Sequence, residues 1–189
     1  MSPVDPSYFE RLYAADEDPW DFESSWYERR KYEITLASLP EPRYRSGFEP
    51  GCSIGVLSAL LASRCEQLLA VDLLAAPVAR AAERLRGWDG VTVEQRLVPE
   101  EWPDGPFDLV VLSELAYYFD ATGLGRMMDA ALRTATRNAT FVAVHWRGET
   151  DYPLTGDQVH RLIGSTSGLC HFARHLEDDF VLDVWRGPA

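Results

Sequence analysis

Hydrophobic and polar positions follow two alternating periods from residue 47 onwards. Short, nearly continuous apolar runs such as Phe107 to Leu112 predict strands buried on both faces of a parallel sheet. Apolar residues spaced three or four apart predict helices, as in Thr122 to Arg137. Strand and helix alternate, which is typical of a doubly wound sheet with helices on both faces. The first expected strand ends at residue 49, and the next four span 67–71, 91–93, 107–112 and 140–145. The expected helices span 55–64, 77–86 and 122–137.

Two further strand-like runs stand near the end of the chain, at Leu169 to His175 and at Phe180 to Trp185. Only the residues from Leu176 to Asp179 separate them, and so short a connection joins antiparallel neighbours. The pattern therefore predicts a Rossmann-like, doubly wound, mostly parallel α/β sheet with a C-terminal antiparallel hairpin.

Residues 1–46 differ from the rest because they are polar, rich in aromatic residues and interrupted by five prolines. Within them, residues 24–39 fit a helix that Pro40 stops. A chain of 189 residues, 46% of them hydrophobic, suits one compact domain. We therefore expect a single domain over 1–189, with residues 1–46 as an N-terminal helical lid and 47–189 as the α/β core.

A turn of small residues follows the first expected strand of the core. Gly51 and Gly55 lack a Cβ, so the backbone can turn sharply and approach a ligand closely. Glu49 ends the first strand and Asp72 ends the second, and both ends face the crevice where doubly wound sheets bind ligands. Asp72 is then placed to accept hydrogen bonds from ribose hydroxyls. The alternative is a tight turn without a ligand.

The spacing of this turn discriminates between nucleotide cofactors. A dinucleotide fingerprint would need glycine at positions 53 and 56, which are Ser53 and Val56, and no Gly-Lys-Ser/Thr of a P-loop follows. The residues Glu49, Gly51, Ser53 and Gly55 instead resemble the acidic-x-G-x-G-x-G motif of class I methyltransferases, with serine in place of the middle glycine. That resemblance implies S-adenosylmethionine (SAM) as the cofactor and the seven-stranded methyltransferase fold.

Other parts of the core resemble the same superfamily. Residues 107–114 look like its fourth-strand motif, whose end lies beside the transferring methyl group. Residues 96–98 fall where its adenine-contacting turn is expected, and Leu97 stands where many relatives have an aspartate. Adenine would then be held by backbone groups and apolar contacts. The residues expected to bind SAM are Trp20, Arg30, Glu49, Gly51, Ser53, Gly55, Asp72, Leu73, Arg96, Leu97, Val98 and Ser113.

Six segments narrow the resemblance further: YFERLY (8–13), DPWDF (18–22), YERRKY (27–32), AVHWR (143–147), DYPLTGD (151–157) and LDVWR (182–186). Together they resemble the nodulation protein S family of methyltransferases over nearly the full length. The family's namesakes N-methylate the freed amino group of a chito-oligosaccharide. The resemblance implies an amine N-methyltransferase with a small-molecule acceptor, such as an aminosugar.

Candidate residues for the chemistry follow the fourth and fifth expected strands. Glu114 is placed to hold an ammonium group or take its proton, and Tyr117 to direct the amine lone pair. His145 could act as a general base near neutral pH, or be a satisfied buried group. The residues expected at the acceptor are Tyr118, Trp146, as a stacking surface for a sugar ring, and Tyr152.

Two lid residues are assigned to the cofactor. Trp20 is expected to pack against it, and Arg30 to pair with its carboxylate through a charge-assisted contact. The alternatives are that the aromatic residues of the lid only cover the core and that Arg30 is solvated.

Composition narrows the partners. The net charge is −12, and Arg29 to Lys31 is the only short basic run, which argues against nucleic acid and an acidic membrane surface. The three cysteines stand at unrelated spacings, and no signal peptide or spanning run occurs, so a cytoplasmic protein is expected. His171 and His175 lack companions at ligand spacing, so no metal is expected. An O-methyltransferase and a non-catalytic SAM-binding module stay open as alternatives.

Overall fold

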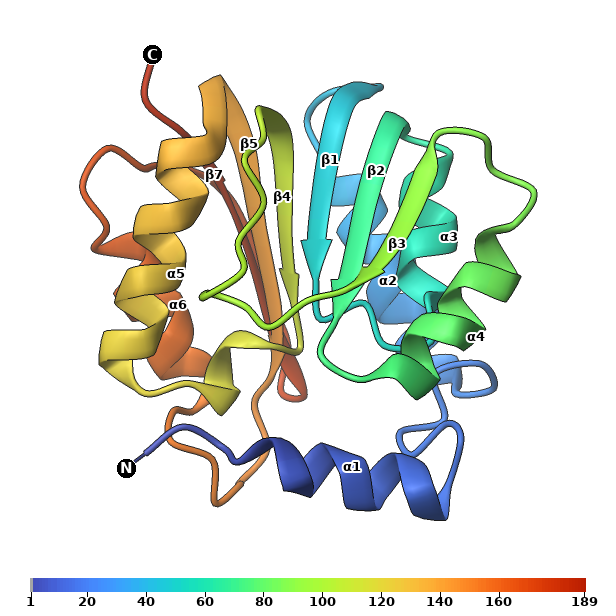
Figure 1. The fold of residues 1–189 in the computed structure, drawn as a ribbon. Coiled ribbons are helices and arrows are strands. Elements are labelled where there is room, and N and C mark those ends of the chain that lie inside the picture. Colours follow the sequence, from blue (N-terminus) through green and yellow to red (C-terminus); the bar gives the residue numbers. More distant parts are fainter. Residues whose placement is uncertain (1) are drawn as a thin grey trace.

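The computed structural model describes residues 2–189 and contains a seven-stranded sheet with the order β3-β2-β1-β4-β5-β7-β6 (Figure 1). The strands are β1 (Tyr44–Pro50), β2 (Cys65–Asp72), β3 (Val91–Gln95), β4 (Phe107–Ser113), β5 (Ala135–Trp146), β6 (Cys170–Leu176) and β7 (Phe180–Arg186). The helices are α1 (Pro6–Ala15), α2 (Trp26–Ser38), α3 (Val56–Ala62), α4 (Ala75–Leu85), α5 (Ala121–Thr134) and α6 (Gly156–Gly164), with a 3₁₀ turn η1 (Ala116–Tyr118).

The strand pairing confirms the predicted fold class. Strands β3, β2, β1, β4 and β5 pair in parallel, whereas β7 pairs antiparallel with both β5 and β6. The chain runs outward from β1 to β3 and then returns to the other side of β1 with β4. The order therefore reverses between β1 and β4, and a crevice outside the carboxyl ends of these strands is where this kind of sheet binds ligands.

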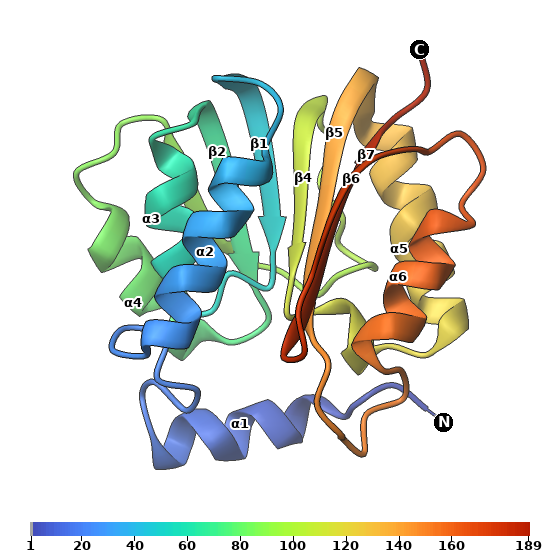
Figure 2. The ribbon, with the colours of Figure 1, turned by 180° about the vertical axis from the view of Figure 1, so that it is seen from behind.

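Helices cover both faces of the sheet, and the alternation along β4 shows why its sequence is continuously apolar. Leu109 and Val111 pack with α2 and α3 on one face. Val110 and Leu112 pack with α5 and α6 on the other. Figure 2 shows α2 and α3 on the first face, with α5 and α6 set behind the plane of the sheet. Burial on both faces places β4 at the centre of the core.

Several element boundaries differ from the prediction. The helix expected to reach Arg137 ends at Thr134, because Ala135 turns to an extended backbone and pairs with Phe107 of β4. Pairing with a neighbouring strand thus outweighs local helix preference. Strand β1 begins at Tyr44, before the expected boundary at residue 47.

Two helices differ from expectation: α1 was not delimited from the sequence, and α6 was not predicted. Helix α6 begins with a capping box, in which Thr155 and Gln158 each bond the other's backbone N–H. Helix α1 begins at Asp5, whose side chain accepts from the Ser7 N–H, with Pro6 in the first turn. Figure 1 shows α1 across the end of the sheet where the strand arrows point. The N-terminal segment therefore covers the carboxyl ends of the strands.

Each helix within residues 2–189 is too short or too polar to cross a membrane.

Candidate functional site

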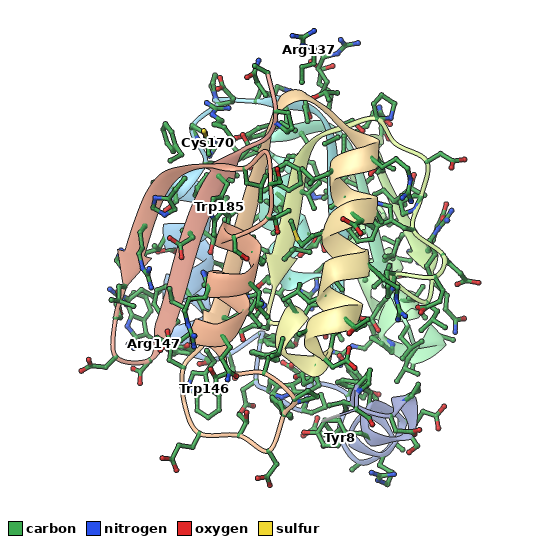
Figure 3. All side chains as sticks on the ribbon, turned by 90° about the vertical axis from the view of Figure 1, so that its left-hand side faces the viewer. Tyr8, Arg137, Trp146, Arg147, Cys170 and Trp185 are labelled. Atoms are coloured by element: carbon green, nitrogen blue, oxygen red, sulfur yellow. The ribbon has the colours of Figure 1, made fainter. Side chains whose placement is uncertain are left out.

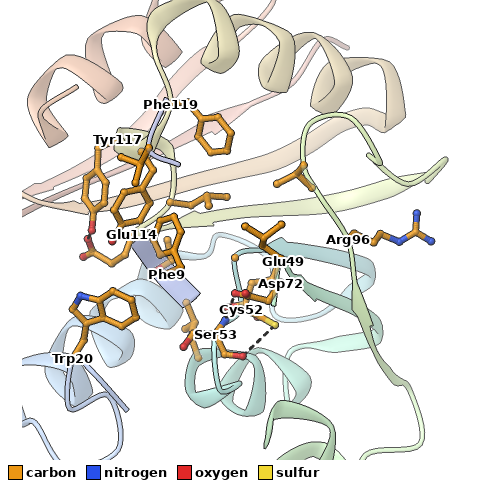
Figure 4. A pocket seen from close by; sticks show the side chains of 18 of the residues that line it. Phe9, Trp20, Glu49, Cys52, Ser53, Asp72, Arg96, Glu114, Tyr117 and Phe119 are labelled. Atoms are coloured by element: carbon orange, nitrogen blue, oxygen red, sulfur yellow. Dashed lines mark hydrogen bonds between the residues drawn. The ribbon is translucent and has the colours of Figure 1, made fainter. Parts of the chain in front are cut away.

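A cavity of about 550 Å³ lies at the carboxyl ends of β1, β2 and β4, against α1 and α2 (Figure 4). Its size is typical of sites for small molecules and cofactors. The predicted site residues that line it are Trp20, Glu49, Gly51, Ser53, Asp72, Leu73, Arg96, Leu97, Val98, Ser113, Glu114, Tyr117, Tyr118, Trp146 and Tyr152. Three predicted residues, Arg30, Gly55 and His145, do not line it.

The turn after β1 takes a left-handed backbone at three positions, Gly51 (φ 75°), Ser53 (φ 49°) and Gly55 (φ 78°). This region disfavours serine because of its Cβ. The Ser53 hydroxyl lies 2.5 Å from the hydroxyl of Tyr13, and its N–H donates to Asp72 at 2.9 Å. Serine at the middle glycine position therefore ties the turn to α1, a contact that the sequence did not reveal.

Gly55, which was expected at the cofactor, does not line the cavity and has a packing role. It caps the N terminus of α3, and a Cβ at this position would lie 2.9 Å from the Cβ of Ala81 in α4. Glycine is required here for its positive φ and for the close approach of the two helices.

The carboxylates of Glu49 and Asp72 both lie at the strand ends on the cavity, as predicted. Each accepts hydrogen bonds from other groups of the protein. Glu49 is 2% exposed and accepts a hydrogen bond from Ser58 Oγ at 2.5 Å. Burial raises the pKa of Glu49 to about 8, so the side chain holds a proton at neutral pH. Burial also raises the pKa of Asp72, although the N–H groups of Ser53 and Leu74 stabilise its charge.

A cluster of ionic groups forms the opposite wall of the cavity. Glu114, the residue after β4, has a positive φ of 49° and carries its carboxylate to three donors. Lys31 Nζ donates to Oε1 at 2.6 Å, while the Tyr117 hydroxyl at 2.5 Å and the Trp146 N–H at 3.0 Å donate to Oε2. A strained backbone at such a junction is typical of functional sites.

Lys31 is the main residue that the sequence analysis missed. Its side chain is 1% exposed and lies between Glu28 (2.9 Å) and Glu114 (2.6 Å). Burial opposes its charge, but the two carboxylates outweigh that effect and raise the pKa of Lys31. The ammonium group thus bridges α2 to the turn after β4.

Arg30, the neighbouring residue, was expected to pair with the cofactor, but it does not line the cavity. Its guanidinium makes a bidentate pair with Glu177 in the β6–β7 turn, at 2.7 and 2.6 Å. Successive helical residues point about 100° apart, so only one of Arg30 and Lys31 can face the cavity. The sequence had no signal for the rotation of α2 about its axis.

Of the two roles predicted for His145, a general base and a satisfied buried group, its surroundings fit the second. It has no exposed surface, its Nε2 accepts from the Ala116 N–H at 3.1 Å, and its Nδ1 lies 3.1 Å from His160 Nε2. Burial, then the nearby His160 and Lys31, lower the pKa of His145 well below its usual value. The expected general base is therefore a neutral, enclosed group behind the cavity wall.

Aromatic side chains line the mouth of the cavity. Tyr117 stacks on Tyr152 with ring centroids 5.3 Å apart, and Tyr118 meets Phe9 of α1 edge-on at 4.8 Å. The Tyr152 hydroxyl lies 3.1 Å from that of Tyr8. In Figure 3, Tyr8 and Trp146 lie at the same end of the molecule, opposite Arg137. Helix α1 is thus held to the loops after β4 and β5.

The remaining assignments differ in how directly they face the cavity. Arg96 lines it only in part, because its guanidinium turns aside to Glu94 at 2.7 Å (Figure 4). Within residues 2–189, no three His, Cys, Asp or Glu side chains come together as metal ligands. The lining residues that the sequence analysis missed are Pro3, Val4, Pro6, Phe9, Tyr13, Phe22, Glu28, Lys31, Tyr32, Cys52, Val56, Leu57, Pro99, Glu100, Leu115, Phe119 and Arg126.

The fold and the cavity define a Rossmann-like protein of the seven-stranded methyltransferase-fold class. Residues 7–143 match the family model described as Nodulation protein S (NodS). That match covers well over half of the chain, so the chain belongs to the Nodulation protein S family.

Individual relatives agree with this family. Nodulation protein S of Sinorhizobium fredii is 28% identical over 125 residues, which are 66% of this chain and 55% of the relative. Nodulation protein S of Bradyrhizobium diazoefficiens is 30% identical over 110 residues, 58% of this chain and 52% of the relative. The chain therefore matches about half the length of these curated relatives.

Two solved structures are similar over most of the chain. A putative methyltransferase from Pseudomonas syringae is 42% identical with a TM-score of 0.77, covering 86% of this chain and 99% of that one. The N-methyltransferase NodS from Bradyrhizobium japonicum, in complex with S-adenosyl-L-homocysteine, is 23% identical with a TM-score of 0.86, covering 97% and 98%. The second likeness shows the shared fold.

Proposed function

We propose that this chain is a SAM-dependent methyltransferase that N-methylates an amino group of a small molecule, such as an aminosugar or a chito-oligosaccharide-like acceptor. The observation that carries the proposal is one continuous cavity with Glu49 and Asp72 at one end and Glu114 at the other. Membership of the Nodulation protein S family and the likeness to an N-methyltransferase structure support it.

The residues at the strand ends fit such a cofactor. Asp72 uses its oxygens for two backbone N–H groups, and a carboxylate has about four acceptor positions, so hydroxyl groups of a ribose can still bind. Glu49 is a buried acid with a raised pKa, and a cation bound beside it would favour its ionised form. Leu97 and Val98 offer an apolar surface to a base. When bound, SAM supplies a methyl group on a positively charged sulfonium.

The other end of the cavity fits an amine. Glu114 uses three acceptor positions, which leaves about one on Oε1 for an amine N–H. Its negative charge stabilises the positive charge that develops on the nitrogen during transfer. The Tyr117 hydroxyl donates to Glu114, so a lone pair of its oxygen can accept a second amine hydrogen and orient the amine.

We assign the part of residues 1–46 that precedes β1 the role of a lid within a single domain. Helix α1 reaches both ends of the cavity, through Tyr13 at Ser53 and through Tyr8 at Tyr152. Alignment of the reactants and exclusion of water can supply up to about 7–11 kcal/mol of the barrier lowering. Tyr118, Trp146 and Tyr152 then form the acceptor side of this enclosure, and Trp20 the cofactor side.

The second candidate function is O-methylation, and the enclosure of His145 favours the amine. A hydroxyl acceptor needs a base that takes its proton as the oxygen attacks, whereas a neutral amine does not. His145 has no exposed surface, and the Glu114 carboxylate already binds three donors. Mass spectrometry of the labelled product distinguishes an N-linked from an O-linked methyl group.

Asp72→Ala tests the cofactor assignment. We expect SAM binding, measured by titration calorimetry, to weaken about tenfold or more, because one or two hydrogen bonds to a charged group are lost. Asp89→Ala, an exposed carboxylate outside the cavity, is the matched control and should bind like the parent chain. A parent chain that gives no heat with SAM or S-adenosylhomocysteine would contradict the proposed cofactor.

From the raised pKa of Glu49 we expect SAM binding to release a proton. Its pKa is raised to about 8 by burial, so at pH 7 it is mostly protonated. A cation bound beside it lowers that pKa, and about one proton should leave per SAM bound. The release should fade above pH 8, where the acid is already ionised.

Calorimetry in two buffers of different ionisation enthalpy measures this proton. Glu49→Gln has no acid to ionise and should give the same binding heat in both buffers. Equal heats for the parent chain at pH 7 would refute the expectation.

A further inference from the structure

A row of hydrogen-bonded side chains runs from the wall of the cavity into the body of the protein. His145 Nδ1 lies 3.1 Å from His160 Nε2, and His160 Nδ1 lies 2.7 Å from Asp183 Oδ2. All three side chains are almost wholly buried, on β5, α6 and β7. Asp183 Oδ1 also meets the half-exposed His171 of β6 at 2.6 Å. We call His145, His160 and Asp183 the histidine chain.

One backbone group sets the direction of every hydrogen bond in the histidine chain. The Ala116 N–H can only donate, so His145 Nε2 must be unprotonated. The hydrogen of the neutral His145 ring is then on Nδ1 and is donated to His160 Nε2. His160 in turn carries its hydrogen on Nδ1 and donates it to Asp183.

Asp183 is the last member of the histidine chain, and its charged carboxylate accepts the hydrogen bonds. Burial opposes its charge, but hydrogen bonds from His160 and His171 outweigh burial and hold the pKa of Asp183 below its usual value. Each ring is therefore fixed in one tautomer and one orientation, because reversing either would set two donors or two acceptors against each other.

At the cavity, the histidine chain acts on the turn that carries Glu114. Ala116 begins η1, between Glu114 and Tyr117. Glu114 has a strained, positive φ, and such a conformation persists only where its surroundings hold it. Two of the hydrogen bonds that hold it come from its own backbone N–H groups: Glu114 N–H donates to Val144 O at 2.9 Å, and Ala116 N–H donates to His145 Nε2 at 3.1 Å.

We propose that His145, His160 and Asp183 are positioning residues, which hold the 114–117 turn through the Ala116 N–H and so aim Glu114 and Tyr117 at the methyl acceptor. The methyl transfer in this proposal rests on the function proposed above. The histidine chain touches neither the turn at Gly51 nor Asp72 through any of these bonds. Its effect should therefore fall on the transfer step and leave cofactor affinity alone.

Two substitutions of one residue test this proposal. His145→Leu removes the acceptor for the Ala116 N–H, whereas His145→Gln can still present an amide oxygen near the position of Nε2. We expect His145→Leu to lower kcat about tenfold to hundredfold, the scale of a misaligned reacting group, with the Kd for SAM within about twofold. His145→Gln should recover most of the loss. His175→Leu is the matched control. His175 does not belong to the histidine chain and pairs with Glu177 instead.

Measurements without turnover keep this proposal separate from the proposed function. Nitrogen NMR of the parent chain should show His145 unprotonated at Nε2 and protonated at Nδ1, and the opposite tautomer would overturn the proposal. In His160→Leu, the Trp146 N–H that donates to Glu114 should exchange with solvent about tenfold faster or more.

Unchanged exchange in His160→Leu, or full kcat in His145→Leu, would also overturn the proposal. A parent chain that has the expected tautomer and exchange but transfers no methyl group would contradict the proposed function only. Loss of SAM binding equal to the loss of kcat in His145→Leu would assign the residue to general stability and reject the positioning role.

Discussion

Replacing Lys31 by methionine is expected to lower the free energy of unfolding by about 3–5 kcal/mol, the usual effect of removing one partner of a buried ion pair. Lys31 is 1% exposed and separates two carboxylates, those of Glu28 and Glu114. Without it, both would stay buried with no cation between them. Glu28 Oε2 already lacks a hydrogen-bond partner, so the loss of Lys31 adds to a carboxylate that is only partly satisfied.

The adjacent residue is a matched control. Arg30→Met also removes a cation from α2, but its pair with Glu177 is partly exposed and should contribute much less to stability than the buried pairs of Lys31. Denaturant unfolding of both variants without ligand gives the comparison. Similar losses in the two variants would contradict the burial argument.

The pH dependence of Lys31→Met has a defined sign. Burial raises the pKa of Glu28 above its usual value, so this carboxylate takes up its proton at a higher pH in the folded chain than in the unfolded one. Its raised folded pKa means that the folded variant binds more protons than the unfolded one in weakly acidic solution. The penalty of Lys31→Met should therefore shrink as the pH falls from 7 towards 5 and grow as it rises.

Glu114→Gln is expected to lower kcat/KM for the acceptor about 10²–10³-fold, the scale of removing one preorganised group that stabilises transition-state charge. Glutamine keeps the shape but loses the charge opposite the developing ammonium, and its NH₂ group cannot accept from Lys31, Tyr117 or Trp146. Steady-state kinetics with an aminosugar panel measures the acceptor effect, and calorimetry measures SAM affinity.

The kinetics report on the acceptor end of the cavity, and the calorimetry reports on the cofactor end. SAM affinity should change less than about threefold in Glu114→Gln, because Asp72 and the turn after β1 keep their contacts. Glu66→Gln, on the exposed face of β2 and outside the main cavity, should retain full activity. Equal losses for acceptor and cofactor would contradict the placement of Glu114 beside the acceptor.

Much of the core was predictable because local sequence is sufficient there. A continuous apolar run such as Phe107 to Leu112 can only be stable with both faces covered, and the structure buries it between two helical layers. Residues at the carboxyl ends of parallel strands share one edge of the sheet. The common position of Glu49 and Asp72 at the cavity could therefore be predicted before any distance was known.

The sequence could not predict which of two adjacent side chains faces the cavity. Arg30 and Lys31 differ by one step of a helix, and His145 and Trp146 by one step of a strand. In each pair the second residue lines the cavity and the first is turned away. A helix packs by its whole surface and a strand by its pairing register, and both are set by distant residues.

The turn after β1 shows the same division. By its composition alone the sequence determined that a strand ends in Glu49, that the chain turns tightly through small residues, and that a helix follows. The tertiary structure decided that Ser53 meets Tyr13 of α1 and that Gly55 serves the packing of α3 on α4. Local periodicity specifies elements and their ends, whereas contacts between segments far apart in the chain depend on how complete layers pack.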